Sequence, residues 1–244
     1  MQWIDSGVVL GTRRHGETSV ILELMTLTRG RHLGLVRGGR GKRLAATLQT
    51  GNTVQATWSA RIEEQLGNYT VEGETLRAAQ LIDSAAALYA VGYVASLLRL
   101  LPEREPHEGL YAALTIILDH IELPQVAAPL IIRFEVALLA ALGFGLDLTS
   151  CASTGAREDL VYVSPKSGRA VSRAAGLPYH DRMLPLPAFL AGRAGDNLSP
   201  ETLHNGFQMT QFFLQQHVFE PRGLTLPQQR ATFVDAVMRS FATQ

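Results

Sequence analysis

Residues 16–43 read GETSVILELMTLTRGRHLGLVRGGRGKR. The first part of this segment contains regularly spaced apolar residues, and its end contains mainly glycine and basic residues. Over residues 19–25 apolar side chains recur at every second position, and residues 31–37 return in the same manner after a glycine-bearing turn. A period of two is typical of a half-buried strand. The segment therefore predicts two antiparallel strands followed by a loop rich in glycine and arginine.

Three further strands are expected near this pair. Residues 7–10 come before it, residues 54–62 alternate clearly, and residues 69–74 provide a fifth strand. Five short strands separated by glycine-bearing turns are typical of a small closed barrel such as the OB-fold. We therefore expect an N-terminal five-stranded OB-fold β-barrel over residues 1–77.

Beyond residue 77 the apolar spacing becomes helical. Helices are expected at 77–101, 109–121, 124–142, 199–219 and 227–243, with prolines near their ends. Residues of about 147–187 are instead rich in Gly, Ser and Arg, with one strand-like piece at 160–163. The expected fold class is α+β and multidomain: the barrel is followed by an all-α domain, residues 78–244, which carries an insertion at about 147–187.

Basic residues gather in the N-terminal part of the chain. The whole chain has 22 basic and 22 acidic residues, yet residues 1–61 contain nine basic and three acidic ones. No acidic residue lies between Thr26 and Arg61, and residues 29–43 alone contain five arginines and one lysine. This clustering favours a polyanion such as nucleic acid as the partner of the barrel.

The segment VRGGRGKRL, residues 36–44, is the candidate nucleic-acid loop. Its glycines let the backbone approach phosphates, and its cations displace condensed counterions. The alternative is a solvated hairpin tip whose charges only keep the protein soluble. Trp58 is expected in the core, whereas Trp3 and Tyr69 remain open as base-stacking platforms. The candidate DNA-binding residues are Arg13, Arg14, Arg31, Arg37, Arg40, Lys42, Arg43 and Arg61.

The sequence contains no recognisable catalytic or cofactor motif. Gly41-Lys42 lacks the other residues of a P-loop, and the seven histidines show no metal-ligand spacing. Cys151 is either a nucleophile or, as is commoner for a lone cysteine, a packed apolar side chain. We therefore expect a protein that is not an enzyme and has no cofactor.

No segment predicts a signal peptide or a membrane span. The longest uncharged apolar run is residues 84–98, and the run at 130–146 is interrupted by Arg133 and Glu135. A single cysteine excludes an intramolecular disulfide and suits a reducing compartment. We expect a cytoplasmic protein without membrane contact.

Three segments together resemble the RecO family of bacterial recombination mediators. They are residues 16–43, IIRFEVALLAALGFGLDLTSCASTG at 131–155, and VYVSPKSGRAVSRAAG at 161–176. The resemblance implies an OB-fold, a helical domain and a small zinc-finger-like insertion. It also implies binding of single- and double-stranded DNA, annealing of complementary strands, pairing with RecR, contact with the C-terminal tail of single-stranded-DNA-binding protein, and help in loading RecA. A nucleoid-associated location follows from the same likeness.

The insertion departs from the family pattern at its metal site. Many RecO proteins carry two CxxC pairs there, but this chain reads Cys151-Ala152-Ser153-Thr154 at the first and has no cysteine at the second, near residues 168–176. A structural zinc site normally needs four Cys or His ligands. We predict that the insertion binds no metal and is held by packing of Leu160, Tyr162 and Val171.

Arg133 is a charge within an otherwise apolar helical segment. Leu130 and Phe134 belong to an apolar stripe in the same segment. The resemblance places a pocket for the acidic, apolar-ended tail near this helix, so Leu130, Arg133 and Phe134 are the candidate peptide-binding residues. An internal salt bridge, to Asp147 or near Glu135, is the alternative. Some relatives carry a second basic residue where this chain has Ile132.

Two functions remain open on the sequence. The first is a recombination mediator that works through Arg37, Arg40, Lys42 and Arg43. The second is an OB-fold module that organises protein partners or binds structured RNA, with incidental DNA contact. Charge reversal at Arg40, Lys42 and Arg43 separates them, because only the first predicts loss of strand annealing while partner binding stays intact.

Overall fold

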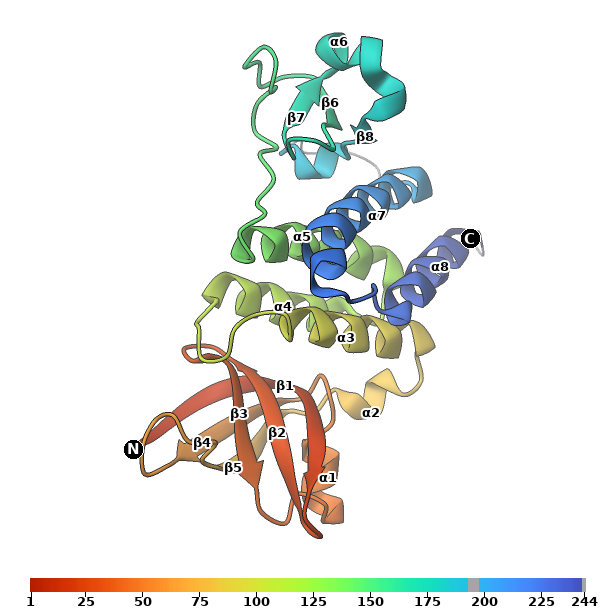
Figure 1. Cartoon of the computed structure of the whole chain (residues 1–244). Coiled ribbons are helices and arrows are strands. Elements are labelled where there is room, and N and C mark those ends of the chain that lie inside the picture. Colours follow the sequence, from red (N-terminus) through yellow and green to blue (C-terminus); the bar gives the residue numbers. More distant parts are fainter. Residues whose placement is uncertain (193–197, 243–244) are drawn as a thin grey trace. The chain divides into compact units, whose positions relative to one another are not determined.

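The computed structural model describes residues 1–192 and 198–242, and the chain divides into two compact units (Figure 1). The first unit is Met1–Glu122 and the second is Leu123–Gln244. The first unit therefore extends past residue 77, the boundary expected from the sequence. It includes helices as well as the strands.

Five strands close into a barrel in the first unit: β1 (Gln2–His15), β2 (Ser19–Thr26), β3 (Gly30–Val36), β4 (Thr53–Ser59) and β5 (Asn68–Thr75). Their order around the barrel is β1-β2-β3-β5-β4. The pair β3 and β5 is parallel, and the other neighbours are antiparallel. Apolar side chains on the inner face, including Val9, Leu22, Leu24, Val54 and Trp58, fill the interior, which explains the period of two in the sequence.

The five predicted strands are present, but their limits differ. β1 begins at Gln2 because its first half pairs with β4, where Gln2 lies opposite Ser59. β4 ends at Ser59, three residues before the end expected from the sequence. A short helix, α1 (Lys42–Thr47), is missing from the sequence-based prediction. None of its residues is fully buried, so no apolar periodicity marks it.

Three more helices complete the first unit: α2 (Ala78–Leu81), α3 (Ala85–Leu98) and α4 (Glu108–His120). The helix expected at 77–101 is interrupted because the Ser84 side chain caps α3, accepting a hydrogen bond from the Ala87 N–H at 3.2 Å. Arg99, which follows α3, connects it to the barrel. Its Nε lies 2.6 Å from Oε2 of Glu23, and its Nη2 donates to the Leu10 carbonyl at 2.5 Å.

Three long helices form the body of the second unit: α5 (Pro124–Ala141), α7 (Pro200–Leu214) and α8 (Gln228–Ala242). A π-helical turn, η3 (Gln215–Phe219), and a 3-10 turn, η4 (Glu220–Arg222), follow α7. A buried ion pair joins α5 to α8, since Arg230 Nε lies 2.8 Å from Glu135 Oε1. Arg230 also donates to the Phe207 carbonyl of α7 at 2.8 Å. Loss of either charge would leave the other buried without an ion-pair partner. The pair, with the bond to Phe207, therefore favours one packing of α5, α7 and α8.

The segment between α5 and α7 forms a small sheet of three strands, β6 (Leu160–Val163), β7 (Ala170–Ser172) and β8 (Leu184–Pro185), in the order β7-β6-β8. Leu160 and Val171 are buried, and Tyr162 is half-buried against Gly176, which agrees with the predicted packing. Cys151 is also buried, and its sulfur accepts a hydrogen bond from a backbone N–H at 3.3 Å. Over residues 1–192 and 198–242, no three His, Cys, Asp or Glu side chains form a metal-binding group. Three short helices lie in the same segment: α6 (Arg173–Gly176), η1 (Leu177–Arg182) and η2 (Ala188–Leu190).

One helix of the described chain, α5, is long and apolar enough to cross a membrane by length and composition. Arg133 and Glu135, the two charges expected to interrupt the apolar run at 130–146, both lie on this helix. Half of α5 is buried inside the structure, and the core helix of a soluble protein meets the same criterion.

Candidate nucleic-acid interface

The basic loop predicted from the sequence connects the end of β3 to α1. Gly38 has a φ of +67°, which favours glycine. Gly39 approaches the barrel so closely that an added Cβ would lie 2.6 Å from Val20. These glycines let the loop turn tightly against the barrel while its charged side chains stay in solvent. The four exposed cations, called the loop cations below, are Arg37, Arg40, Lys42 and Arg43.

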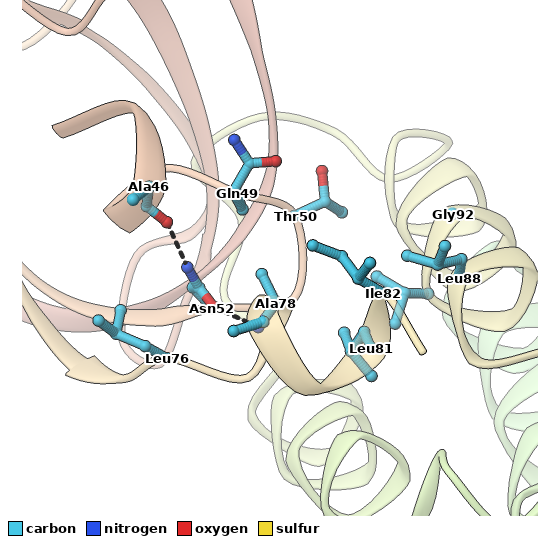
Figure 2. A pocket seen from close by; sticks show the side chains of 12 residues that line it. Ala46, Gln49, Thr50, Asn52, Leu76, Ala78, Leu81, Ile82, Leu88 and Gly92 are labelled. Carbon is cyan, nitrogen blue, oxygen red and sulfur yellow. Dashed lines mark hydrogen bonds between the residues drawn. The ribbon is translucent and has the colours of Figure 1, made fainter. Parts of the chain in front are cut away.

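Asn52 holds the helix that carries two of these cations (Figure 2). Its side-chain amide donates to the carbonyls of Ala46 and Thr47, both at 3.0 Å, at the end of α1. Its Oδ1 accepts from the N–H of Ala78, the first residue of α2, at 2.9 Å. Leu48, which follows α1, is buried. A six-residue helix with few packing contacts of its own is therefore anchored by one buried amide.

Two adjoining hollows separate α1 and the basic loop from β5. The first measures about 850 Å³ and the second about 470 Å³, and Leu44, Thr70 and Val71 line both. We call them together the α1–β5 groove. Its polar and charged lining is Arg37, Lys42, Arg43, Thr47, Ser59, Asn68, Thr70 and Glu72, with Tyr69 at one wall.

The charge of the loop cations is not neutralised internally. In the parts of the chain that the structure describes, none of the four forms an ion pair. Arg40 instead donates through its guanidinium to the Glu17 carbonyl and through its backbone N–H to the Thr18 carbonyl at 3.0 Å. The loop is thus fastened to the β1–β2 turn, and its positive charge remains available to an anion.

Arg31, another predicted DNA contact, is used inside the protein. Its Nη1 lies 2.7 Å from Glu23 and its Nη2 3.6 Å from Glu103. Its Nε donates to the Leu101 carbonyl at 2.9 Å. With two carboxylates and a carbonyl around it, this half-buried guanidinium connects the barrel to the segment after α3. Arg31 is therefore not part of the candidate interface.

The other predicted contacts are exposed but dispersed. Arg13 and Arg14 are neighbours on β1, so their side chains leave opposite faces. Arg13 lines a separate hollow with Glu23 and Arg99, while Arg14 lies opposite Val20. Arg61 is exposed two residues after Ser59, which lines the α1–β5 groove. The structure thus gathers Arg37, Lys42 and Arg43 along one groove and leaves Arg13 outside it.

The aromatic residues of the barrel contact one another. Trp58 is buried as expected, and Tyr69, left open by the sequence, is only 4% exposed. Trp3 is half-buried and stacks on Trp58 with ring centroids 5.6 Å apart. The Tyr69 hydroxyl lies 2.8 Å from Nδ1 of His32. Burial lowers the pKa of His32 to about 4, and the positive charge of Arg104 acts in the same direction.

A second hollow of interest lies in the other unit, beside α5. It measures about 430 Å³, and Leu130 and Arg133 line it together with Gln125, Val126, Pro129, Leu198 and Phe241. Arg133 is exposed, with its guanidinium 5.1 Å from the Phe189 ring centroid. Phe134, the third predicted peptide contact, is instead buried in the core and does not line this hollow.

The proposed internal salt bridges of Arg133 are not formed. Glu135 pairs with Arg230, and Asp147 pairs with Arg169 at 3.2 Å. Arg133 itself donates to the Phe189 carbonyl at 3.2 Å and has no ion-pair partner within residues 1–192 and 198–242. An exposed cation at the edge of an apolar hollow suits a ligand that is both acidic and apolar.

Two family models match the chain, one over its N-terminal part and one over most of the remainder. The family model described as "Recombination protein O N terminal" matches residues 1–78, and the one described as "Recombination protein O C terminal" matches residues 83–225. The chain belongs to the RecO family. The gap between these two matches lies near residue 77, whereas the compact units divide after Glu122 because α3 and α4 contact the barrel.

Several relatives share more than half of their residues with this RecO chain. "DNA repair protein RecO" of Methylorubrum populi is 56% identical over 239 residues, which covers 96% of this chain and 97% of the relative. The protein of the same name from Chelativorans sp. is 56% identical over 240 residues, covering 98% and 97%. That of Mesorhizobium japonicum is 51% identical over 244 residues, covering 100% and 96%. Likeness over nearly the whole chain supports a role in DNA repair.

Some residues of the α1–β5 groove were not predicted from the sequence. Asn68 and Thr70 lie on the outward positions of β5, and their alternation with the buried Tyr69 and Val71 was a usable signal. No pattern in the sequence marks Asn52 in this way. Its role depends on α1 and α2, two short helices that only the folded chain brings to either side of it.

Proposed function

We propose that this RecO protein is a recombination mediator that binds single- and double-stranded DNA through the α1–β5 groove. In this proposal it anneals complementary strands and, with RecR, helps to load RecA onto DNA covered by single-stranded-DNA-binding protein. The observation that carries the proposal is the set of loop cations, exposed and free of ion pairs in the described chain, beside a groove with one acidic side chain, Glu72. It acts by binding and not by catalysis, in the cytoplasm at the nucleoid.

The barrel supports the proposal through its topology. Five strands closed in the order β1-β2-β3-β5-β4 agree with an OB-fold, a barrel commonly used to bind oligonucleotides. An OB-fold binds nucleic acid across a strand face and its adjoining loops. Here the strand is β5 and the loop is the basic one. We also assign the small sheet between α5 and α7 to a zinc-finger-like insertion that has lost its metal ligands.

Titration of a labelled single-stranded oligonucleotide in a salt series tests the DNA site. Log affinity is expected to fall with log salt at a slope of about −3, as for about four neutralised phosphates. The variant R37E/K42E/R43E is expected to lose DNA binding and annealing while RecR binding stays intact. Arg40 is left in place because it also fastens the loop to the β1–β2 turn.

A matched control variant separates the loss of the groove cations from the change in net charge of the protein. The variant R157E/K166E/R182E reverses three exposed cations of the insertion, which form no ion pair within the described residues. It changes the net charge by the same amount and is expected to bind DNA as the wild type does. If R37E/K42E/R43E still anneals strands, the groove is not the DNA site, and a module that organises protein partners or binds RNA becomes the better description.

We further propose that the hollow beside α5 binds the C-terminal tail of single-stranded-DNA-binding protein. An acidic, apolar-ended peptide can place apolar side chains against Leu130 and a carboxylate on Arg133. In a polarisation assay with a labelled peptide of this kind, Arg133→Glu is expected to weaken binding at least about tenfold. Arg133→Lys should retain part of the affinity and Arg182→Glu all of it. Unchanged binding by Arg133→Glu would exclude this hollow.

A further inference from the structure

We infer that the α1–β5 groove holds a DNA strand by its phosphates and leaves the bases unstacked and free to pair. This inference rests on the proposed DNA site and adds the mode of binding. It follows from which side chains face the groove and which are committed to the interior of the barrel.

The outward positions of β5 are polar. Asn68, Thr70 and Glu72 are exposed, whereas the intervening Tyr69 and Val71 point into the barrel. Across the groove lie the guanidinium and ammonium groups of the basic loop and α1. Cations, a hydroxyl and an amide are groups that contact phosphate oxygens. The groove therefore offers contacts to a nucleic-acid backbone along both walls.

The aromatic side chains of the barrel, which could stack on bases, instead contact other residues of the barrel. Trp58 is 1% exposed, and Trp3 is stacked against it. Tyr69 is the one aromatic residue at the groove wall, and its hydroxyl forms a hydrogen bond with His32. Its ring is covered by Gly34, where an added Cβ would lie 2.3 Å away. All of residues 1–122 are described, and no other aromatic side chain lines this groove.

The missing aromatic platform changes the energetics of binding. Proteins that bind single strands without sequence preference usually gain about 1–3 kcal/mol per base from stacking on aromatic rings. That contribution must be given up again before a bound base can pair with a complementary strand. A groove that holds only the phosphates carries no such cost, so a bound strand remains ready to anneal.

Comparison of a normal and an abasic oligonucleotide of equal length, in anisotropy titrations at one salt concentration, tests the inference. We expect the two affinities to agree within about twofold, with the same salt slope, because each strand carries the same phosphates. Both should be lost in R37E/K42E/R43E and kept in R157E/K166E/R182E.

The other outcomes separate this inference from the proposed function. If the normal strand binds more than about tenfold tighter than the abasic strand, bases are contacted, and the inference is wrong although the DNA site stands. If both strands bind but R37E/K42E/R43E binds them equally well, the groove is not the site and the inference falls with it. If neither strand binds the wild type, the proposed function and the inference both fail.

Discussion

Arg31 and Arg37 lie at the two ends of β3 and carry the same charge in different surroundings. Arg31 contacts Glu23 and Glu103, so its charge is balanced and its side chain is half-buried. Arg37 is exposed beside the α1–β5 groove with no such partner in the described chain. The clustering of basic residues in the sequence identified the segment that contains both arginines. It could not separate the two arginines, because Glu103 lies far from β3 in the sequence.

His32 makes the stability of the barrel depend on pH. Burial lowers its pKa to about 4 from the ordinary 6.5, with the charges of Arg104 and Arg29 adding to the effect. Above pH 6.5 the ring is neutral in the folded and unfolded chains. As the pH falls from there to about 4, the unfolded chain binds the proton first, so the free energy of unfolding decreases, by about 3 kcal/mol.

The substitution His32→Asn tests this linkage, since it keeps a polar group for Tyr69 and removes the titration. Urea unfolding at pH 7 and pH 5 is expected to show a smaller loss of stability for His32→Asn than for the wild type. His15→Asn, at an exposed histidine, serves as the control and should follow the wild type. An equal loss of stability in His32→Asn and the wild type would contradict the role of His32.

Among the elements, α1 places Lys42 and Arg43 at the α1–β5 groove, and Asn52 anchors α1. Asn52→Ala removes the partners of the Ala46 and Thr47 carbonyls and of the Ala78 N–H. Each backbone group left unpaired costs about 1–3 kcal/mol if it stays buried. We expect α1 to fray and DNA affinity to fall by about threefold to tenfold, although no charge is lost.

Hydrogen exchange of the α1 amides and oligonucleotide titration of the same sample measure both effects. Gln49→Ala is a close control, because Gln49 also donates to a carbonyl of α1, that of Ala45, but is exposed. It should leave both measurements unchanged. If folded Asn52→Ala shows fast exchange in α1 and wild-type DNA affinity, Lys42 and Arg43 do not need the helix to reach DNA.

Elements with a strong apolar period were predictable, and elements without one were not. Strands β2 to β5 and the helices α4, α5, α7 and α8 lie where the sequence places them, within a few residues, whereas β1 extends five residues beyond its expected limits at each end. α1 buries no residue completely and α2 spans four residues, so neither leaves an amphipathic pattern. Only part of the groove could therefore be predicted from the sequence. The cations were identified, but the helix that carries two of them was not.

Within the first unit, contacts between the barrel and α3–α4 show which segments support the barrel. Arg99 contacts Glu23 and the Leu10 carbonyl, and Arg31 bonds to the Leu101 carbonyl. Tyr111 of α4 donates to Ser6 of β1 at 3.2 Å. A chain cut near residue 78, where the N-terminal family match ends, loses all of these contacts.

We predict that a fragment of residues 1–122 unfolds cooperatively and binds single-stranded DNA with nearly the affinity of the full chain. The fragment 1–78 should be less stable, because cutting there leaves Glu23 with one arginine instead of two and uncovers apolar side chains of the barrel. Circular dichroism melts and oligonucleotide titrations of both fragments provide the measurement. If 1–122 folds but binds DNA far more weakly than the full chain, cations of the second unit also contact DNA. If 1–78 is as stable as 1–122, the helices do not support the barrel, and the boundary near residue 77 marks an independent OB-fold domain.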